Sequence, residues 1–288
     1  MLETTGLLIF GFFVGAYGTL VGIGGGPLIV PMLTLAYHYP PSSIISISLF
    51  AIFFNTLSGT TAYIKQKRVD IINGTKFGLA TIPGAFLSTY AVDFISLHTF
   101  STVFGLFLIA LAIYIFTKPT ETEIVRNSHT TLTSQSLNRS RSNITLYQTY
   151  IRKIAPERAI EDAMGNVYKY RVNVPAGVGI SALIGAVSTF LGIGGGVIQV
   201  PALVYLLSFP VHIGTATSHY ITAINTLFTL IPFIAHGDIV YRTAVLLSIG
   251  VIAGAQVGAW ISPKISAQIT LRLLTPVFIL TGIKLLFS

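Results

Sequence analysis

Long apolar stretches separated by short polar turns dominate the chain. They cover residues 6–21, 27–38, 43–63, 75–92 and 99–117 in the first half, and 174–191, 197–208, 213–235, 243–260 and 270–287 in the second. Most are as long as a helix that crosses the ~30 Å core of a bilayer. Segments 27–38 and 197–208 have only 12 residues, about 18 Å as a helix, which is too short to cross alone. The pattern predicts an all-α polytopic membrane protein with five helical segments in each half.

The few charged residues lie outside these segments. Only 9% of the 288 residues are charged, against about 25% in an ordinary soluble domain. Of 17 Lys and Arg residues, nine lie between Lys118 and Arg171 and four between Lys65 and Lys76. No Asp, Glu, Lys or Arg occurs from Thr4 to Ile64 or from Asn173 to Gly237. Uncharged runs of that length indicate several membrane spans and exclude a water-soluble globule.

The two halves are copies of one sequence unit. Residues 22–33 read GIGGGPLIVPML, and residues 192–203, 170 positions later, read GIGGGVIQVPAL. With that spacing and no gap, 16 of the 45 residues from Gly15 to Gly59 are identical to their partners. Such a match indicates a tandem duplication. We therefore expect a first transmembrane repeat (1–117), a polar loop (118–172) and a second transmembrane repeat (173–288).

Loop charge predicts the orientation of the chain. Basic residues follow the third and fifth segments of the first half, whereas turns 39–42 and 93–98 contain no Lys or Arg. Because positive loops face the cytoplasm, we expect the large central loop inside the cell, the N-terminus outside, and the protein in the plasma membrane. Five traversing segments per half would make the second half inverted. If the short segments are re-entrant, each half crosses four times and the repeats are parallel; charge favours the inverted arrangement.

The central loop is the one polar stretch of the chain. Residues 167–174 alternate like a short strand and follow the turn residues Gly165 and Asn166. The loop is either a tether between the halves or a small regulatory element. The net charge of +8 is concentrated in loops, as expected for loops that face anionic lipid. We therefore predict a lipid bilayer, and no nucleic acid, as partner.

Each glycine cluster separates a full-length segment from a short one. Consecutive glycines let the chain leave helical geometry, and the following short helix begins with free N–H groups and the positive end of its dipole. Two such starts related by pseudo-symmetry predict an anion site near the middle of the membrane. The alternative is tight helix packing, which requires glycine at four-residue spacing. The candidate glycines are Gly22, Gly24, Gly25, Gly26, Gly192, Gly194, Gly195 and Gly196.

Uncharged polar residues follow the same duplication. The repeated candidates are Ser48 and Asn55 in the first copy, and Ser218 and Asn225 in the second. Each serine lies seven residues before its asparagine, on the same helical face. These groups can donate hydrogen bonds to an anion, or they can bond neighbouring helices.

Two further polar candidates occur only in the second copy. They are Gln199 and His219, which have Ile29 and Leu49 as partners in the first copy. This asymmetry suggests that one side of the site is tuned separately. His219 is either a satisfied polar residue or a proton carrier.

Missing residues exclude several classes of function. The chain has no cysteine, which excludes disulfides and thiolate metal sites. No carboxylate lies inside a span, which excludes a relay through buried Asp or Glu. No His-Glu-x-x-His or Gly-x-Ser-Gly motif occurs, so an intramembrane protease is not expected. We predict no enzymatic activity, no cofactor and no metal.

The doubled motif resembles that of the sulfite exporter TauE/SafE family of membrane transporters. The resemblance covers essentially the whole chain and is supported by Asn55, Asn225 and the polar central loop. It implies movement of small sulfur-containing anions, such as sulfite or organosulfonates, across the plasma membrane. Beyond the glycines, the motif residues that it carries over are Pro31 and Pro201.

These observations lead to one hypothesis for function. The chain is expected to be a secondary transporter that binds a small anion between the two glycine breaks and moves it by alternating access. The alternatives are an anion channel, because the same breaks could line a pore, and a transporter of an unrelated small organic anion. A homo-oligomer is compatible with the sequence, which indicates no interface.

Overall fold

The computed structural model describes residues 2–37, 39–92, 94, 96–117 and 157–265, together with 276, 279–280 and 282–284. The first half contains α1 (Leu2–Val21), α2 (Gly26–Ala36), α3 (Pro41–Lys65), α4 (Ile71–Val92) and α5 (Leu97–Thr117). The second contains α8 (Val174–Phe190), α9 (Gly196–Pro201), a π-helix (Ala202–Leu206), α10 (Val211–His236), α11 (Tyr241–Ile261) and a 3-10 turn (Ser262–Lys264). Nine of the ten predicted segments are helical, and the tenth, 270–287, lies largely outside the described residues.

Local sequence accounts for several of the helix ends. The residue before α3 is Pro40 and the residue before α10 is Pro210, and proline suits the extended entry into a first helical turn. The side chain of Asn173 caps α8 by accepting a hydrogen bond from the N–H of Ala176. Gly237 ends α10 in the left-handed region, at φ 77°.

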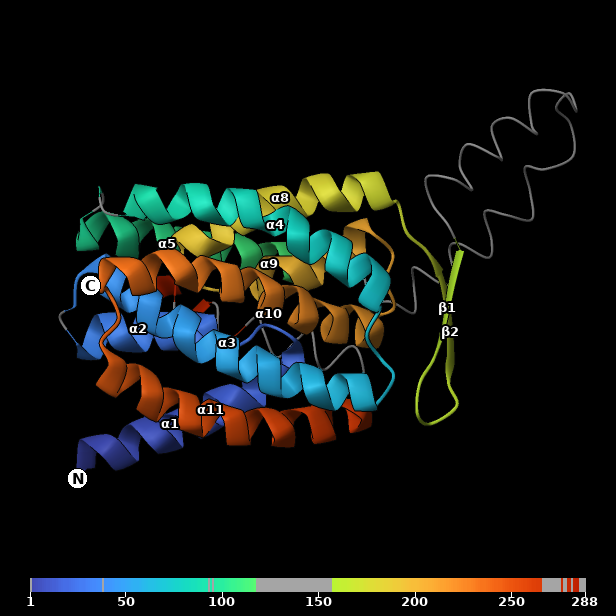
Figure 1. Ribbon diagram of the computed structural model, residues 1–288, viewed down its shortest axis with the longest axis horizontal. Coiled ribbons are helices and arrows are strands. Elements are labelled where there is room, and N and C mark those ends of the chain that lie inside the picture. Colours follow the sequence, from blue (N-terminus) through green and yellow to red (C-terminus); the bar gives the residue numbers. More distant parts are fainter. Residues whose placement is uncertain are drawn as a thin grey trace, which may run out of the picture.

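The two halves interlock instead of lying side by side. Figure 1 shows α1 along α11 at one edge and α4 along α8 at the opposite edge, with α3 and α10 between them. Glycines make these contacts close: Gly15 lies against the backbone of Val251, and Gly185 lies against the backbone of Thr81. The two contacts are copies of each other, because both pairs of positions differ by 170. The duplication is therefore visible in the packing as well as in the sequence.

The first two helices form a broken helical hairpin. α1 runs along α11 in the same direction, since Gly11 meets Leu247 and Gly15 meets Val251. After the break, α2 returns toward the start of α11, because the hydroxyl of Tyr39 lies 3.4 Å from that of Thr243. The short helix therefore does not cross the molecule by itself.

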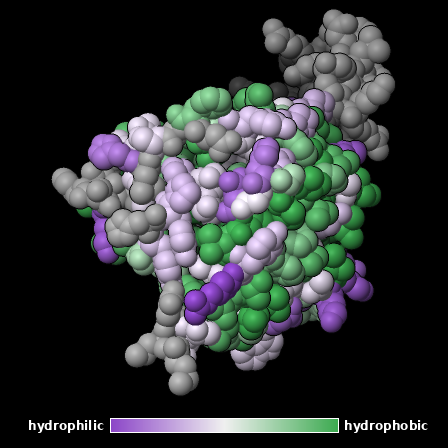
Figure 2. Space-filling view, turned by 60° about the vertical axis from the view of Figure 1, so that its left-hand side comes forward, coloured by the Kyte–Doolittle hydropathy of each residue, from purple (hydrophilic) through white to green (hydrophobic). Residues whose placement is uncertain are grey.

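The sides of the helical bundle are apolar. Figure 2 shows a broad hydrophobic face, and the exposed side chains include equivalent residues of both copies, such as Phe13 with Leu183 and Leu57 with Leu227. Among the described helices, four are long and apolar enough to cross a membrane: Thr4–Val21, Pro41–Lys65, Val211–His236 and Tyr241–Lys264. Exposed apolar surface of this extent suits contact with lipid.

A two-stranded antiparallel sheet is the exception to the helical fold. It pairs β1 (Glu157–Glu161) with β2 (Val167–Arg171), with Glu157 opposite Arg171, which confirms the strand predicted after Gly165. The all-α prediction thus holds for the described residues of the two halves and not for the described part of the central loop. Residues 118–156 of that loop lie outside the described residues.

This hairpin, residues 157–171, docks on the connection between α3 and α4. The N–H of Ala163 donates to the carbonyl of Gln66 over 3.0 Å, and the hydroxyl of Tyr170 donates to the carboxylate of buried Asp70 over 2.8 Å. Arg158 lies 3.7 Å from the same carboxylate. Burial, and then the negative charge of Asp70, raises the pKa of Tyr170, so the phenol stays a donor. The ring of Tyr170 also packs against Phe209, at 4.8 Å between centroids.

Candidate functional site

Both glycine clusters break the helix in the same backbone conformation. The φ angles are 86°, 74° and 92° at Gly22, Gly24 and Gly25, and 66°, 72° and 100° at Gly192, Gly194 and Gly195. Positive φ is readily available only to glycine, so these six residues allow the chain to stop one helix and start another. We refer to residues 22–25 as the first break and residues 192–195 as the second break.

The two breaks touch each other. A Cβ added to Gly26 would lie 2.6 Å from the Cα of Ile193, and one added to Gly196 would lie 2.8 Å from the Cα of Ile23. These contacts are again related by the offset of 170 positions. Both breaks are buried throughout. The structure therefore brings together the two glycine clusters that the sequence singled out.

The breaks meet near the middle of the bundle. Gly24 and Gly194 both approach Ile52, whose Cγ2 atom would lie 2.9 Å and 2.8 Å from a Cβ at these positions. Ile52 is near the midpoint of α3, and Thr222, which also faces Gly24, is near the midpoint of α10. The breaks are thus far from both ends of the two long central helices.

The repeated asparagines and serines bind the carbonyl groups of the breaks. Asn55 Nδ2 donates to the carbonyl of Gly24 over 2.8 Å, and Asn225 Nδ2 donates to that of Gly194 over 3.3 Å. The serines cross to the other copy: Ser48 donates to the carbonyl of Gly192 (2.8 Å) and Ser218 to that of Gly22 (3.2 Å). In this conformation these four donors therefore stabilise the breaks and satisfy backbone groups at membrane depth.

Backbone N–H groups remain open where the short helices begin. Those of Gly25 and Gly26 in the first copy, and of Gly195, Gly196 and Val197 in the second, form no hydrogen bond with the described residues. The first N–H groups of any helix lack intrahelical partners, and α2 begins at a glycine without a side-chain cap. These groups point a partial positive charge into the centre of the protein.

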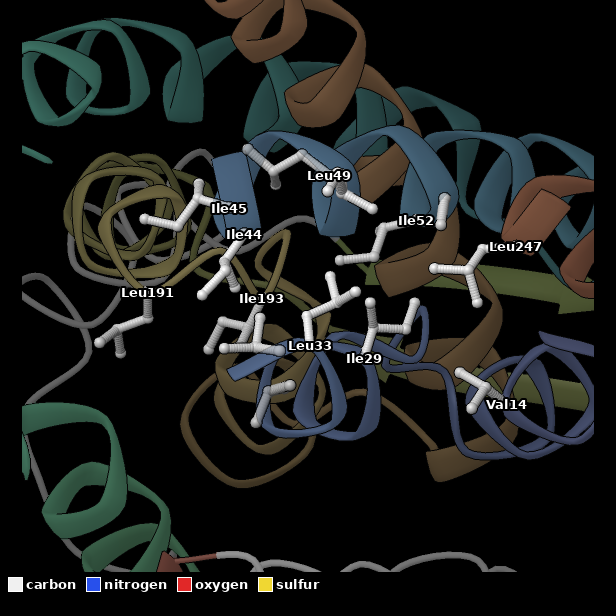
Figure 3. Packing of buried hydrophobic residues seen from close by; sticks show 14 of the residues in the cluster. Val14, Ile29, Leu33, Ile44, Ile45, Leu49, Ile52, Leu191, Ile193 and Leu247 are labelled. Carbon is white, nitrogen blue, oxygen red and sulfur yellow. The ribbon is translucent and has the colours of Figure 1, made fainter. Parts of the chain in front are cut away.

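Apolar side chains surround the first break. A Cβ at Gly25 would meet Val14 and Ile29. Figure 3 shows Ile29 and Leu33 of α2 packed among Ile52 and other aliphatic side chains of α3. The first copy's own polar pair is bonded, because Thr19 donates to Asn55 Oδ1 over 3.0 Å. Thr215 and Thr222 of α10, which face Gly22 and Gly24, have hydroxyls without a partner among the described residues.

The second break has a more polar lining. A Cβ at Gly195 would lie 3.4 Å from Ser188 Oγ and 3.7 Å from Asn225 Nδ2. Asn225 Oδ1 and Thr189 Oγ1, the equivalents of the bonded pair in the first copy, are both buried without a hydrogen-bond partner among the described residues. Unpaired buried polar atoms are uncommon in proteins, so their presence here marks a place where a ligand or water is expected.

The remaining predicted residues also lie at this centre. Gln199 is buried in the first turn of α9; its Nε2 donates to Ser181 Oγ over 3.2 Å, while its Oε1 has no partner among the described residues. Pro31 and Pro201 are buried inside α2 and at the end of α9. After Pro201 the helix continues as a π-helix, which fits the loss of a backbone donor at proline. Both prolines therefore shape the short helices and do not offer polar groups.

His219 is buried on α10 beside the first break. Its Nε2 lies 3.1 Å from Thr19 Oγ1, and its ring packs edge-on against Tyr63 with centroids 5.7 Å apart. Thr19 is in turn bonded to Asn55. His219 is thus connected to the first break through two side chains of the first copy.

The sequence analysis missed four threonines with unpaired hydroxyls: Thr60, Thr189, Thr215 and Thr222. Thr215 and Thr222 lie on α10 with Ser218, His219 and Asn225 between and after them, all buried. Their spacing of three, four and seven residues places them on one helical face. That periodicity of polar residues was the signal that could have identified them.

A family model and two known proteins match nearly the whole chain. The family model of the sulfite exporter TauE/SafE family matches residues 7–285. The chain is 28% identical to YunE of Bacillus subtilis, named a probable membrane transporter protein, over 98% of this chain and 97% of that protein. It is 27% identical to MJ0441 of Methanocaldococcus jannaschii, which carries the same description, over 91% of this chain and 87% of the relative.

Shorter matches give the same result. A probable membrane transporter protein of Xylella fastidiosa is 38% identical over 35% of this chain and 40% of its own length. No solved structure matches the chain. The full-length agreement, together with the doubled glycine break at the centre of an apolar helical bundle, identifies the chain as a membrane transporter of the sulfite exporter TauE/SafE family.

Proposed function

We propose that this protein is a secondary transporter that moves small anions, sulfite or organosulfonates, across the plasma membrane by alternating access. The anion would bind between the two breaks, next to the open N–H groups of Gly25, Gly26, Gly195 and Gly196. The family description supports sulfur-containing anions, and the site chemistry supports a small oxyanion.

The open backbone donors carry this proposal. Five N–H groups of the two helix starts have no partner among the described residues, and they lie where the breaks meet. No Asp, Glu, Lys or Arg occurs between Thr4 and Ile64 or between Asn173 and Gly237, which contain both breaks and most of α3 and α10. Selectivity for an anion must therefore rest on backbone dipoles and neutral side chains, as at other helix-terminal anion sites.

Contacts at the ends of α3 and α10 support an inverted repeat. Ser46, near the start of α3, donates to the carbonyl of Asp238, just after the end of α10. Thr217, near the start of α10, accepts from the N–H of Asp70, just after the end of α3. The equivalent helices therefore run in opposite directions. The short helix does not cross, but this does not make the repeats parallel, because α1 begins and α2 ends on the same side of the molecule, near the start of α11. Rocking of one copy against the other would open the central site alternately to each side.

Charge at the ends of the bundle supports the proposed orientation. The hairpin, the α3–α4 connection and the end of α11 lie together, because Gln66 bonds to Ala163 of the hairpin and to the carbonyl of Ala259. Basic residues collect at this end, among them Lys65, Lys67, Arg68, Arg158, Arg171 and Lys264. By the positive-inside rule this end faces the cytoplasm and the N-terminus lies outside.

Flux into proteoliposomes tests the proposal. The purified protein is reconstituted, and uptake of sulfite, sulfate, thiosulfate and methanesulfonate is measured down a concentration gradient. We expect saturable uptake of at least one sulfur oxyanion, and counterflow when the same anion is loaded inside, because an alternating-access carrier exchanges substrate. Uptake without counterflow would indicate a channel, and no uptake of any probe would refute anion transport.

Substitutions at the breaks test whether the anion binds there. Gly25→Val and Gly195→Val place a branched side chain at φ 92° and 100°, beside the open N–H groups, and should reduce uptake to the level of empty liposomes. The matched control is Gly179→Ala, since an added Cβ there has nothing within 4 Å. Size-exclusion chromatography establishes that each variant is folded. Undiminished uptake by a folded Gly195→Val protein would refute the site.

A further inference from the structure

The hydrogen bonds around His219 determine which ring nitrogen carries a proton. Asn55 Nδ2 donates to the carbonyl of Gly24, which can only accept. This turns Asn55 Oδ1 toward Thr19, whose hydroxyl donates to it over 3.0 Å. Because a hydroxyl has one hydrogen, Thr19 Oγ1 must accept from His219 Nε2, 3.1 Å away. The neutral ring is therefore protonated at Nε2 and unprotonated at Nδ1.

The unprotonated nitrogen faces no donor. His219 is fully buried, and its Nδ1 forms no hydrogen bond with the described residues. A buried acceptor without a partner is unfavourable, and a proton would convert Nδ1 into a donor. Nδ1 is therefore an open binding position for a proton, on a ring that is connected to the first break through Thr19 and Asn55.

The ring occupies a slot that the first copy provides. A Cβ at Gly59 would lie 2.7 Å from His219 Cδ2 and 2.9 Å from Nε2, so only glycine leaves room there. Tyr63 packs edge-on against the ring at an interplanar angle of 87°. The duplication does not repeat this slot. The first-copy equivalent of His219 is Leu49, and the second-copy equivalent of Gly59 is Thr229. The slot therefore exists once in the molecule and holds the imidazole in one orientation.

No charged group offsets a proton at this position. The groups that face His219 are Thr19 of α1 and Gly59 and Tyr63 of α3. Tyr63 is the titratable one, and Arg68 lies 5.7 Å above its ring. No Asp, Glu, Lys or Arg occurs from Thr4 to Ile64, a range that contains these three residues, or in α10. A protonated ring would therefore need an anion beside it.

We propose that His219 is the proton-binding site of the transporter and that a proton on its Nδ1 crosses the membrane together with the anion. The inference rests on the proposed anion transport. A lone anion in the uncharged centre of the protein is costly, and imidazolium beside the first break supplies the missing opposite charge. Water on the entry side gives the proton to Nδ1, and water on the exit side receives it, so one monoanion and one proton move without net charge.

Methanesulfonate tests this coupling, because its single charge is independent of pH. Wild-type proteoliposomes with a pH indicator inside should acidify as the anion enters. At equilibrium they should accumulate methanesulfonate about tenfold for each unit of inward proton gradient, whatever the imposed membrane potential. In His219→Gln the amide nitrogen can still donate to Thr19 but binds no proton. Its uptake should lose acidification and pH-driven accumulation and become dependent on potential.

Controls separate the possible failures. His236→Gln changes an exposed histidine at the far end of α10 and should behave as wild type. Proton movement that persists in His219→Gln, or wild-type methanesulfonate uptake without proton movement, would overturn the coupling while leaving anion transport intact. Absence of flux for every anion probe would instead refute the proposed function.

A spectroscopic measurement tests proton binding without relying on flux. Histidine labelled with 15N in lipid nanodiscs gives the His219 signals by difference from His219→Gln. They should show the neutral Nε2–H form near pH 8 and protonation of Nδ1 as the pH falls with methanesulfonate present. A ring that stays neutral down to about pH 5 would overturn the proposal, as would a neutral ring protonated at Nδ1 only.

Discussion

Around the first break, Gly25 faces Val14 and Ile29, whereas around the second break Gly195 faces Ser188 and Asn225. The backbone conformation and the contacts between the breaks are the same in both copies. The asparagine of the first copy has both ends bonded, and that of the second copy has a free oxygen. The duplication thus keeps the geometry of the break while the side chains around it have diverged.

This difference teaches how a membrane protein can combine stability with a polar site. Buried polar atoms without partners reduce stability. In the described residues six of the seven lie in the second copy: Thr189, Gln199, Thr215, His219, Thr222 and Asn225. The seventh is Thr60 of α3, in the first copy. The first copy places Ile29, Ile45, Leu49 and Ile52 at four of the equivalent positions. We therefore expect the first break to act mainly as support and the second break to contribute more to binding.

The largest effect is expected where both copies are alike. Gly26→Ala and Gly196→Ala each place a methyl group against the backbone of the other break. Because backbone cannot move aside as a flexible side chain can, each variant should lose about 3 kcal/mol of folding free energy, measured by unfolding in mixed SDS micelles. The control is Gly179→Ala, which should leave stability unchanged. A tolerated alanine at either position would show that the breaks separate easily.

Variants of the two asparagines should distinguish a role in folding stability from a role in anion binding. Asn55→Ala leaves the hydroxyl hydrogen of Thr19 without an acceptor and the Gly24 carbonyl without its donor, and should cost about 2 kcal/mol. Asn225→Ala removes only a 3.3 Å bond to Gly194 and should cost about 1 kcal/mol, yet reduce anion uptake more than Asn55→Ala. The same unfolding and flux assays compare them. Equal losses of stability with equal losses of uptake would contradict the proposed division between the copies.

Replacing a residue by its equivalent from the other copy should change folding stability less, and the sign of the change can be predicted. Gln199→Ile introduces the residue of the first copy and removes an unpaired oxygen, so stability should rise by about 1 kcal/mol. Loss of this polar group should also lower uptake. The mirror variant Ile29→Gln should be less stable than wild type, because it buries an amide among aliphatic side chains. A destabilised Gln199→Ile protein would show that the polar lining of the second break stabilises the fold instead of lowering its stability.

The smallest effect is expected for the pH dependence of the hairpin, which is present beside the short helix of the second copy and not beside that of the first. It covers Phe209 of the second copy, whereas the equivalent Tyr39 stacks on Tyr37 at 5.3 Å. Although desolvation opposes it, hydrogen bonds from Asn166 and Met164 lower the pKa of Asp162 in the turn of the hairpin.

The sign of the pH dependence follows from that lowered pKa. The stabilisation is complete above the ordinary Asp value of about 4 and is lost as the pH falls through the lowered folded value. Hydrogen exchange of residues 157–171, corrected for intrinsic rates, should accelerate below about pH 4, while exchange in α3 and α10 does not. Asp162→Asn should remove this pH dependence. Parallel acceleration in the helices would indicate global unfolding instead.

Much of the site could be predicted because it depends on local chemistry. The glycine clusters require positive φ, and only glycine supplies it three times in four residues, so both breaks were visible in the sequence. Asn55, Asn225, Ser48 and Ser218 were visible because they are polar, apolar-flanked and duplicated. Their hydrogen-bond partners were not visible, since each serine bonds the break of the other copy.

The unpaired threonines show why the rest could not be predicted. A threonine in an apolar helix commonly bonds the carbonyl four residues earlier, as Thr56 and Thr226 do. Thr215 and Thr222 do not. Their periodicity places them on the polar face of α10, but it does not reveal that their hydroxyls lack a partner. The docking of the hairpin on Asp70 was also hidden, because it joins residues about 100 positions apart.

The sequence by itself determined that the chain lies in a membrane, that it is duplicated and that each copy breaks at a glycine cluster. These follow from residue composition, from the offset of 170 positions and from the backbone freedom of glycine. Only the tertiary structure decided that the breaks touch, that the serines cross between copies and that His219 faces Thr19 with Nδ1 open. The reason is physical: small residues permit close crossing of helices, but which groups meet there depends on how all the helices pack.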